Sequence, residues 1–320
     1  MADKADGQGR GKAGRPSALQ PSQEGQVAAV WMDKCLVWRP DGEWVCTWRG
    51  KLRGRPLPVV GDRVTFQPLD GEAGEISAIH PRSSELSRSV AHRGRGGQHS
   101  RVQVLAANVA QVVIVAALHD PPFRTGLVYR LLVTTRLADL APLLCITKCD
   151  LDTGGEYARL ADQFGDLGIP VLGTRQDRAA SLEPLLAALA GRISILVGHS
   201  GVGKTSLLNA LTDQRMRVAE VGFFKDRGRH TTSTARMIPL QGGGMAIDAP
   251  GIREFGLQHI DPQTLAGHFP GFGPYQGRCR FRDCRHLSEN GCAVREALAA
   301  GQLREAHYSA YQRLLADEDV

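Results

Sequence analysis

Gly198-His199-Ser200-Gly201-Val202-Gly203-Lys204-Thr205 matches the pattern G-x-x-x-x-G-K-[ST] at every defined position. In this pattern, glycines let the backbone wrap a phosphate and direct successive N–H groups at it. The apolar residues 193–197 predict a buried strand before the loop. Residues 206–211 predict the opening of a helix after it, and a helix N-terminus attracts anions. The alternative is a glycine-rich turn with an incidental lysine, and the flanking strand and helix make it the poorer explanation.

We expect this loop to bind a nucleoside triphosphate together with Mg²⁺. Lys204 is expected to reach the β- and γ-phosphates and to act in catalysis, and the Thr205 hydroxyl is expected to ligate Mg²⁺. The predicted nucleotide contacts in this stretch are Gly198, His199, Ser200, Gly201, Val202, Gly203, Lys204, Thr205 and Ser206.

Composition excludes several classes of protein. No apolar run approaches 18 residues, so the chain carries no predicted membrane span, and its first ~25 residues lack the apolar core of a signal peptide. A formal net charge of +6 is compatible with a nucleic-acid partner. Seven cysteines, three of them clustered late with a histidine, favour a reducing cytoplasm and a metal site over a disulfide framework.

The first third of the chain has three predicted parts. Residues 1–25 are rich in small and polar residues and predict a disordered tail. Residues 26–83 contain short alternating segments between turns, which predict a small barrel of the oligonucleotide-binding (OB) kind that binds RNA. A purely structural barrel remains possible, and its tryptophans could stack on bases or pack in the core. Residues 84–103 show no periodicity and predict a flexible basic linker, either solvated or binding RNA phosphates.

From residue 104 to about 257 the pattern alternates between strands and helices. Apolar runs at 109–118 and 142–147 are separated by a predicted helix at 124–139, and the alternation continues to the phosphate loop. This predicts a doubly wound α/β sheet with ligands at the carboxyl ends of its strands. After residue 258 the alternation stops, and a cysteine-rich segment leads into a helical stretch from Ala293 to Leu315 that is broken near Gly301.

Two further motifs follow apolar strands. Asp248-Ala249-Pro250-Gly251 fits Asp-x-x-Gly, in which Asp248 would hold a Mg²⁺-bound water and take part in catalysis, and the Gly251 N–H would face the γ-phosphate. Thr147-Lys148-Cys149-Asp150 is similar to the guanine-binding motif [Asn/Thr]-Lys-x-Asp. The Asp150 carboxylate can accept hydrogen bonds from guanine N1–H and N2–H₂, which adenine does not offer together. The alternative for Asp150 is a β-turn residue that caps the next helix.

Gly228-Arg229-His230-Thr231-Thr232-Ser233 lies where the first switch loop of a GTPase would lie. Thr231 or Thr232 would complete the Mg²⁺ shell and sense the γ-phosphate.

The order of these motifs is unusual. The guanine motif precedes the phosphate loop, whereas an ordinary GTPase has the reverse order. A circularly permuted domain explains this, and permutation is tolerated when the original termini are close together at the surface. The second switch, after Gly251, then continues directly into the C-terminal domain.

Cys279, Cys284, His286 and Cys292 supply three thiolates and an imidazole within 14 residues. Zn²⁺ takes this tetrahedral set in closed structural sites, so we expect one structural Zn²⁺. Arginines between these ligands, with Phe281, suggest a surface that faces nucleic acid.

Together these residues resemble the ribosome small subunit-dependent GTPase A family, the circularly permuted assembly GTPases of bacteria. The resemblance covers nearly all of residues 27–315. It rests on the OB-like barrel, Ala107-Asn108-Val109, the permuted motifs, Gly228–Thr232, Asp248–Gly251 followed by Arg253-Glu254-Phe255-Gly256, and the Cys-Cys-His-Cys set.

The resemblance implies GTP hydrolysis that is stimulated by the small ribosomal subunit, binding near its decoding region, and a role late in its maturation. It implies that His230 helps to position the attacking water, and that Ile252 replaces a water-orienting glutamine, so that hydrolysis is slow without the ribosome.

The sequence thus predicts a cytoplasmic, monomeric GTPase of three domains, with the GTPase domain at 104–257 and a zinc-binding, α-rich domain at 258–320. Its expected partners are GTP or GDP, the small ribosomal subunit and its rRNA, and no membrane. One alternative is a nucleotide-gated rRNA-binding module with incidental hydrolysis. A second is an ATP-dependent enzyme.

Overall fold

The computed structural model describes residues 21–31, 33–48, 57–94, 97–212, 235–248 and 260–316. Most of the predicted tail, the switch residues His230, Thr231 and Thr232, and Gly251 of the Asp-x-x-Gly motif lie outside the described residues.

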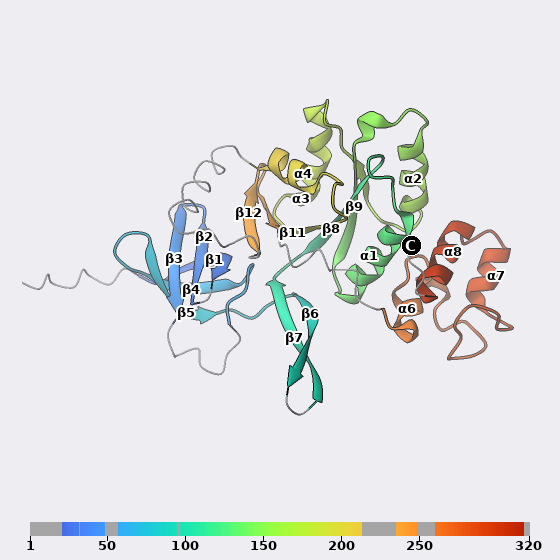
Figure 1. The fold of residues 1–320 in the computed structure, drawn as a ribbon, viewed down its shortest axis with the longest axis horizontal. Helices are drawn as coiled ribbons and strands as arrows, with labels where there is room; N and C mark the ends of the chain where they lie inside the picture. Colours follow the sequence, from blue (N-terminus) through green and yellow to red (C-terminus); the bar gives the residue numbers. More distant parts are fainter. Residues whose placement is uncertain are drawn as a thin grey trace, which may run out of the picture.

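The chain begins with a β-barrel and continues into an α/β domain and a helical C-terminal part (Figure 1). The barrel strands are β1 (Gln23–Trp31), β2 (Lys34–Arg39), β3 (Gly42–Trp48), β4 (Arg63–Pro68) and β5 (Ala73–Ile79). A hairpin follows, with β6 (Glu85–Gly94) and β7 (Gly97–Ala107). The α/β strands are β8 (Gln111–Ala117), β9 (Ala141–Thr147), β10 (Val171–Gly173), β11 (Ile193–Val197), β12 (Arg236–Leu240) and β13 (Gly244–Asp248).

The helices lie between these strands and after them. In the α/β domain they are α1 (Thr125–Leu137), α2 (Glu156–Gly165), α3 (Glu183–Leu189) and α4 (Lys204–Leu211). In the C-terminal part they are α6 (Pro262–His268), α7 (Ala293–Ala299) and α8 (Glu305–Leu315). The break predicted near Gly301 is confirmed, because α7 ends before it and α8 begins after it. Among the described residues, no helix is long and apolar enough to span a membrane.

The predicted N-terminal barrel is confirmed. Strand β1 pairs with β2 along one edge and with β4 along the other, and this closes the order β1-β2-β3-β5-β4. Alternate side chains point inward, which the period-2 pattern of a strand requires. They form a core that includes Val27, Val37, Val64 and Phe66, all fully buried.

The barrel begins earlier than the sequence indicated. Residues 23–25, placed in the predicted tail, belong to β1 and pair with β4. A Cβ on Gly25 would lie 2.4 Å from the Val37 side chain, so the closing strand passes too near β2 for a side chain to fit without movement. The local composition of the tail gave no sign of this pairing with a strand 40 residues later.

The segment predicted to be an irregular basic linker is a β-hairpin. Strands β6 and β7 pair from Glu85↔Ala107 to Gly94↔Gly97. Figure 1 shows the hairpin extending away from both the barrel and the large sheet. The prediction was wrong because the segment has no apolar alternation, and backbone hydrogen bonds within a hairpin need none.

The doubly wound sheet is confirmed, with the order β10-β9-β8-β11-β13-β12. Strands β10, β9, β8, β11 and β13 are parallel, and β12 pairs with β13 in an antiparallel hairpin. Both faces of this sheet are covered. Val112, Ile114 and Ala116 of β8 pack in a core with α1, whereas Val113 and Val115 pack on the opposite face with α3 and α4. Burial on both faces explains the continuous apolar run of β8.

The barrel and the α/β domain share one sheet. Ala29 of β1 pairs with Arg236 of β12, so the strand order continues from one part into the other. A second contact lies at Asn108, whose amide donates to the Gly61 carbonyl at 2.9 Å and accepts from Ser83 N–H at 2.9 Å. A Cβ on Gly61 would lie 2.1 Å from the Ala107 carbonyl oxygen, so glycine is required at this crossing.

A buried ion pair lies near this junction and joins the segment before β4 to the segment after β5. Arg82 Nε and Nη2 donate to the two carboxylate oxygens of Asp62 at 2.7 and 2.9 Å. The Asp62 side chain is fully buried, and its Oδ2 also accepts from Val59 N–H at 2.8 Å. Such bidentate pairs combine charge with fixed geometry.

We predict that Arg82→Ala lowers the free energy of unfolding of the barrel by about 3–5 kcal/mol, because it leaves the buried Asp62 carboxylate without its cation. All four tryptophans, Trp31, Trp38, Trp44 and Trp48, lie in the barrel sequence. Tryptophan fluorescence during urea denaturation therefore measures this transition.

The matched control is Arg39→Ala. Arg39 pairs with Asp41 at 2.8 Å, but the Asp41 side chain is 57% exposed. Water screens such a pair, so this variant should leave the urea midpoint nearly unchanged. Equal losses in the two variants would contradict the role given to the Asp62–Arg82 pair.

Candidate nucleotide and metal sites

The phosphate loop connects β11 to α4 and has the conformation that its glycines predict. Gly198, Gly201 and Gly203 have φ values of +152°, +83° and +90°. A Cβ on Gly198 would lie 2.1 Å from the Val115 carbonyl oxygen of the neighbouring strand, so only glycine fits where the loop leaves the sheet. Gly203 precedes Lys204, the first residue of α4, and the loop therefore ends at a helix N-terminus.

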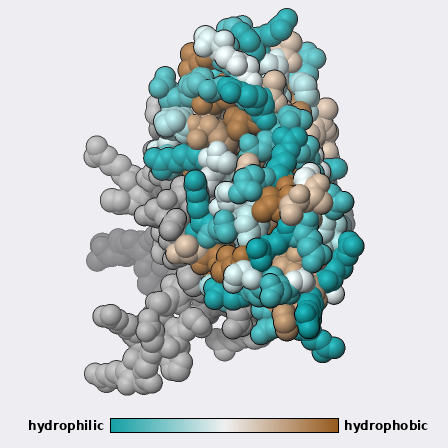
Figure 2. Space-filling model, turned by 90° about the vertical axis from the view of Figure 1, so that its right-hand side faces the viewer, coloured by the Kyte–Doolittle hydropathy of each residue, from teal (hydrophilic) through white to brown (hydrophobic). Residues whose placement is uncertain are grey.

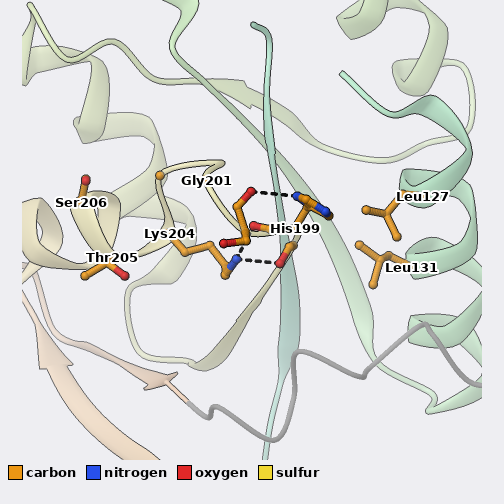
Figure 3. Close-up of a pocket in the computed structure, with 10 residues that line it drawn as sticks. Leu127, Leu131, His199, Gly201, Lys204, Thr205 and Ser206 are labelled. Carbon is orange, nitrogen blue, oxygen red and sulfur yellow. Dashed lines mark hydrogen bonds between the residues drawn. The ribbon is translucent and has the colours of Figure 1, made fainter. Parts of the chain in front are cut away.

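The loop surrounds a cavity of about 440 Å³. Lys204 Nζ donates to the Gly198 and His199 carbonyl oxygens, each at 2.6 Å (Figure 3). Thr205 and Ser206 in the first turn of α4 are exposed and line the same cavity. Of the contacts predicted in residues 198–206, all but Val202 line this cavity, and the Val202 side chain is buried in the core instead.

The opposite wall of the cavity comes from a helix that the sequence analysis did not include in the site. Leu127 and Leu131 of α1 line the cavity and face His199 in Figure 3. They lie one turn apart on α1, a spacing that places two side chains on one helix face. Nothing local marks them as site residues, because leucines at this spacing are typical of any packed helix.

The guanine motif meets the phosphate loop through Thr147. This residue ends β9 and is 5% exposed. Its hydroxyl donates to the Val202 carbonyl oxygen of the phosphate loop at 2.6 Å. The threonine at the position usually held by asparagine therefore makes a short hydrogen bond that links the two motifs.

The other two residues of the guanine motif are also held in place. Lys148 adopts the left-handed conformation, with φ +58°, and its Nζ donates to the Asp120 carbonyl oxygen. Asp150 Oδ1 accepts from Gln176 N–H at 3.1 Å. The helix-cap explanation for Asp150 is wrong, because Asp152 accepts from the Glu156 and Tyr157 N–H groups at the start of α2.

The turn after β10 lies against the guanine motif. Cys149 N–H donates to the Thr174 carbonyl oxygen at 3.1 Å, and Thr174 N–H donates to the Ile146 carbonyl oxygen at 2.8 Å. With the Gln176–Asp150 bond, these contacts place residues 173–176 beside Asp150.

Asp248 lies at the same edge of the sheet as the phosphate loop. It is the last residue of β13 and is exposed. The parallel register pairs Ile247 with Ile195 of β11, three residues before Gly198. The remaining predicted groups of this site, namely His230, Thr231, Thr232 and Gly251, fall outside the described residues.

The predicted metal ligands converge between α6 and α7. Cys279, Cys284, His286 and Cys292 place their ligand atoms within 4.8 Å of one another. His286 Nδ1 lies 3.5 Å from the Sγ atoms of Cys279 and Cys284 and 3.3 Å from that of Cys292. Burial lowers the pKa of His286 despite the nearby Glu289 carboxylate, and this favours the neutral imidazole that binds metals. The cluster can hold one metal ion.

Hydrogen bonds fix the loop that carries these ligands. Tyr308 and Tyr311 of α8 donate their hydroxyls to the His286 and Arg285 carbonyl oxygens at 2.6 and 2.7 Å. Glu289 accepts from the N–H groups of Arg285 and Leu287. Desolvation alone would raise the pKa of Glu289, but these backbone donors lower it to about 2. The loop is thus held by side chains outside the ligand set.

Comparison with known proteins identifies the family. The model of the RsgA GTPase family matches residues 79–258. A relative from Haemophilus influenzae, named small ribosomal subunit biogenesis GTPase RsgA, is 36% identical over 306 residues, which are 93% of this chain and 85% of the relative. The chain belongs to the RsgA GTPase family. Membership makes it a GTP-hydrolysing enzyme, and it confirms the resemblance inferred from the sequence.

Further relatives and solved structures agree with this assignment. A relative of the same name from Bordetella pertussis is 40% identical over 279 residues, covering 86% of this chain and 89% of the relative. The crystal structure of YloQ, a circularly permuted GTPase, matches with a TM-score of 0.72 and 26% identity over 95% of this chain and 97% of that one. The structure of YjeQ from Thermotoga maritima matches with a TM-score of 0.72 and 27% identity over 93% of this chain and 98% of that one. The circular permutation deduced from motif order is therefore confirmed.

We predict that Thr147→Val weakens GTP binding about 5- to 10-fold. The substitution keeps the shape of the side chain but leaves the Val202 carbonyl oxygen without its donor, a loss on the order of 1 kcal/mol. Fluorescent-nucleotide titration measures the dissociation constant. Thr147→Ser retains the hydroxyl and should bind within about twofold of wild type. An unchanged affinity in the valine variant would show that the bond does not support the loop.

Proposed function

We propose that the chain hydrolyses GTP to GDP and phosphate under stimulation by the small ribosomal subunit, and that it acts late in the maturation of that subunit. The observation that carries the nucleotide part is the Thr147–Val202 hydrogen bond, since it joins the guanine motif and the phosphate loop into one site. The relatives' name, small ribosomal subunit biogenesis GTPase, supports the ribosomal part.

In this proposal the phosphate loop and the guanine motif bind the two ends of GTP. Lys204, whose ammonium now donates to two loop carbonyls, donates to the β- and γ-phosphates instead. Asp150 accepts from guanine N1–H and N2–H₂, and Lys148 supports the base. Residues 198–203 offer backbone N–H groups to the phosphates, and Ser206 lies beside them in α4.

Hydrolysis requires an attacking water and a leaving group that is stabilised. The water oxygen bonds to the γ-phosphorus, the bond from that phosphorus to the β–γ bridging oxygen breaks, and the water proton passes to the phosphate product. Mg²⁺, when bound through Thr205 and the Asp248-held water, supplies charge neutralisation at the phosphates. We assign Thr231, Thr232 and Gly251 to sensing the γ-phosphate and His230 to positioning the water.

Three parts of the chain present candidate surfaces for rRNA. In the barrel, Arg39 lies over the Trp44 ring at 5.7 Å, and Trp44 packs on Phe66 at 5.4 Å. The four tryptophans are half-buried, so core packing covers part of each ring and the exposed part is available for base stacking. In the hairpin, the ladder pairs His92 with His99 and Val90 with Arg101, so three basic residues lie on neighbouring rungs of the ladder.

The metal-binding loop is the third surface. Its arginines are exposed, namely Arg278, Arg280, Arg282 and Arg285, and Arg280 lies over the Phe281 ring at 5.6 Å. Figure 2 views the molecule from the side of the C-terminal helices, and this face is mostly hydrophilic with small, separate hydrophobic areas. Such a surface suits a hydrated, charged partner such as RNA better than an apolar protein interface. We propose that the chain acts on the small ribosomal subunit as a monomer in the cytoplasm.

We further propose that the Cys₃His cluster holds one structural Zn²⁺. Zn–S bonds of about 2.3 Å and Zn–N bonds of about 2.0 Å in a tetrahedron separate nitrogen from sulfur by roughly 3.5 Å. The observed separations of 3.3 to 3.5 Å fit this value. Four protein ligands leave no open position, so the ion holds the loop rather than taking part in catalysis.

We predict one equivalent of zinc per chain by elemental analysis, and its loss in Cys292→Ser. Because the ion crosslinks the loop on which α8 packs, the variant should also show a lower melting temperature. Cys35→Ser, which removes a buried barrel thiol outside the cluster, is the control and should retain zinc. Full zinc occupancy in the Cys292 variant would contradict the assignment.

The proposed activity is tested by GTP turnover with and without purified small ribosomal subunits. We expect at least a tenfold stimulation by the subunits, and its loss in Lys204→Ala, because the charge on the β- and γ-phosphates is then unopposed. Large subunits serve as the control and should not stimulate. Equal turnover with and without small subunits would overturn the proposal.

Two measurements separate the alternatives. Equal affinities for ATP and GTP would contradict the role of Asp150 and favour an ATP-dependent enzyme. A His230→Ala variant that no longer hydrolyses GTP, yet binds and leaves the subunit at the normal rate, would favour an rRNA-binding module in which hydrolysis is incidental.

A further inference from the structure

A second cavity lies on the boundary between the GTPase domain and the metal-binding domain, away from the nucleotide site. Its volume is about 390 Å³. Arg136 at the end of α1 and Asp166 after α2 line it from one side, and Tyr275, Arg304 and His307 line it from the other. Neither the nucleotide site nor the metal cluster shares a residue with it.

His307 is the first unusual group in this cavity. It lies in the first turn of α8 and is only 2% exposed. Its Nδ1 contacts the Tyr129 hydroxyl at 2.5 Å, but its Nε2 has no hydrogen-bond partner among the described residues. A buried polar atom without a partner is costly, so such an atom calls for an explanation.

The neighbouring hydrogen bonds indicate which ring nitrogen of His307 carries the proton. Gln163 Nε2 donates to the Tyr129 hydroxyl oxygen at 3.1 Å. When Tyr129 in turn donates its proton to His307 Nδ1, the Gln163 amide N–H, the Tyr129 hydroxyl and His307 Nδ1 each have a partner. The neutral imidazole then has its proton on Nε2. His307 lines the cavity whereas Tyr129 does not, and this Nε2–H is the ring donor that has no partner among the described residues.

Arg136 is the second unusual group. Its guanidinium is half-buried, and its contact in the described part of the chain is a long hydrogen bond from Nη1 to the Phe269 carbonyl oxygen at 3.5 Å. No carboxylate pairs with it in the described part of the chain. Desolvation by burial lowers its pKa, although arginine remains charged at any physiological pH. A half-buried cation without a counter-ion attracts an anion.

The remaining charges nearly cancel one another. Arg304 Nη2 pairs with Asp162 at 2.9 Å, and Arg304 Nε pairs with Asp166. The Asp166 carboxylate, the one negative group among the lining residues, is therefore already held by Arg304. Arg136 and His307 therefore keep hydrogen-bond donors for which the wall of the cavity offers no free carboxylate.

We propose that this cavity is a second anion site, which takes a phosphate group between Arg136 and His307. The phosphate oxygens would accept from the Arg136 guanidinium and from His307 Nε2–H, and so satisfy both groups. The phosphate can belong to a free anion or to the backbone of an RNA. In either case the ligand contacts α1 of the GTPase domain and α8 of the metal-binding domain, and so it strengthens the contact between them.

The test uses the full-length chain saturated with GDP and Mg²⁺, so that the phosphate loop is occupied. Inorganic phosphate is titrated by calorimetry at constant ionic strength. We expect one site in the wild type and at least a tenfold weaker affinity in Arg136→Gln and in His307→Asn. The asparagine oxygen can still accept from Tyr129, as Nδ1 does, but the substitution removes the Nε2–H donor.

The matched control is Arg313→Gln. Arg313 is exposed on α8 and does not line the cavity, so its loss changes net charge equally without touching the site. This variant should bind phosphate as the wild type does. Melting temperature and GDP affinity verify the fold of each variant. Because Arg136 is only half-buried, its variant keeps the test informative even if His307→Asn does not fold.

A second arm distinguishes the source of the phosphate. Binding of a 20-nucleotide oligouridine is measured over a range of salt concentrations. If the site takes an RNA phosphate, Arg136→Gln reduces the slope of log affinity against log salt by about 1, and Arg313→Gln does not. Phosphate binding that is equal in all variants, or the absence of an Arg136-specific effect in both arms, would overturn the proposal. The phosphate arm does not depend on the proposed ribosomal function.

Discussion

The nucleotide site depends on the position of β8 between β9 and β11. Parallel pairing aligns the carboxyl ends of these strands, so that Thr147 at the end of β9 and the loop after Val197 of β11 meet at one edge. The Thr147–Val202 hydrogen bond and the close approach of Gly198 to Val115 follow from this alignment. Two motifs that lie far apart and in permuted order in the sequence become one site because both continue from neighbours of the same strand.

Those parts of the fold that have a strong local pattern could be predicted from the sequence. Continuous apolar runs identified β8 and β9, and the glycine pattern identified the phosphate loop and its flanking strand and helix. The hairpin of β6 and β7 was not predicted because its sequence shows no alternation of apolar residues, which is the pattern that identifies a strand. Helix α6 was not predicted either, because its seven residues are too few to show the helical repeat of apolar positions.

The site was predictable where chemistry is tied to a motif and unpredictable where it depends on tertiary contact. The four metal ligands are close in sequence, and their types alone indicated their role. Leu127 and Leu131 enter the nucleotide cavity only because α1 packs beside the phosphate loop. The metal loop and α1 are in turn joined by buried rings. His286 contacts Phe272, Phe272 contacts Phe269, and Phe269 stacks on Tyr129 of α1 at 5.7 Å. No local pattern links these residues.

The permuted order also determines what the chain exposes while it is being synthesised. During synthesis, β9 is made soon after β8 and can pair with one edge of it. The other edge of β8 has no partner until β11 is made. Gln111 of β8 and Ser194 of β11, which are hydrogen-bonded in the folded chain, are 83 residues apart. At a translation rate of 5–20 residues per second, the apolar edge of β8 remains without its partner for roughly 4 to 17 seconds after it is made. An unpaired apolar strand is a site for wrong pairing. The order of motifs in this chain therefore makes β8 the strand that waits, whereas in an unpermuted domain the phosphate-loop strand is made first and its own edge waits for the counterpart of β8.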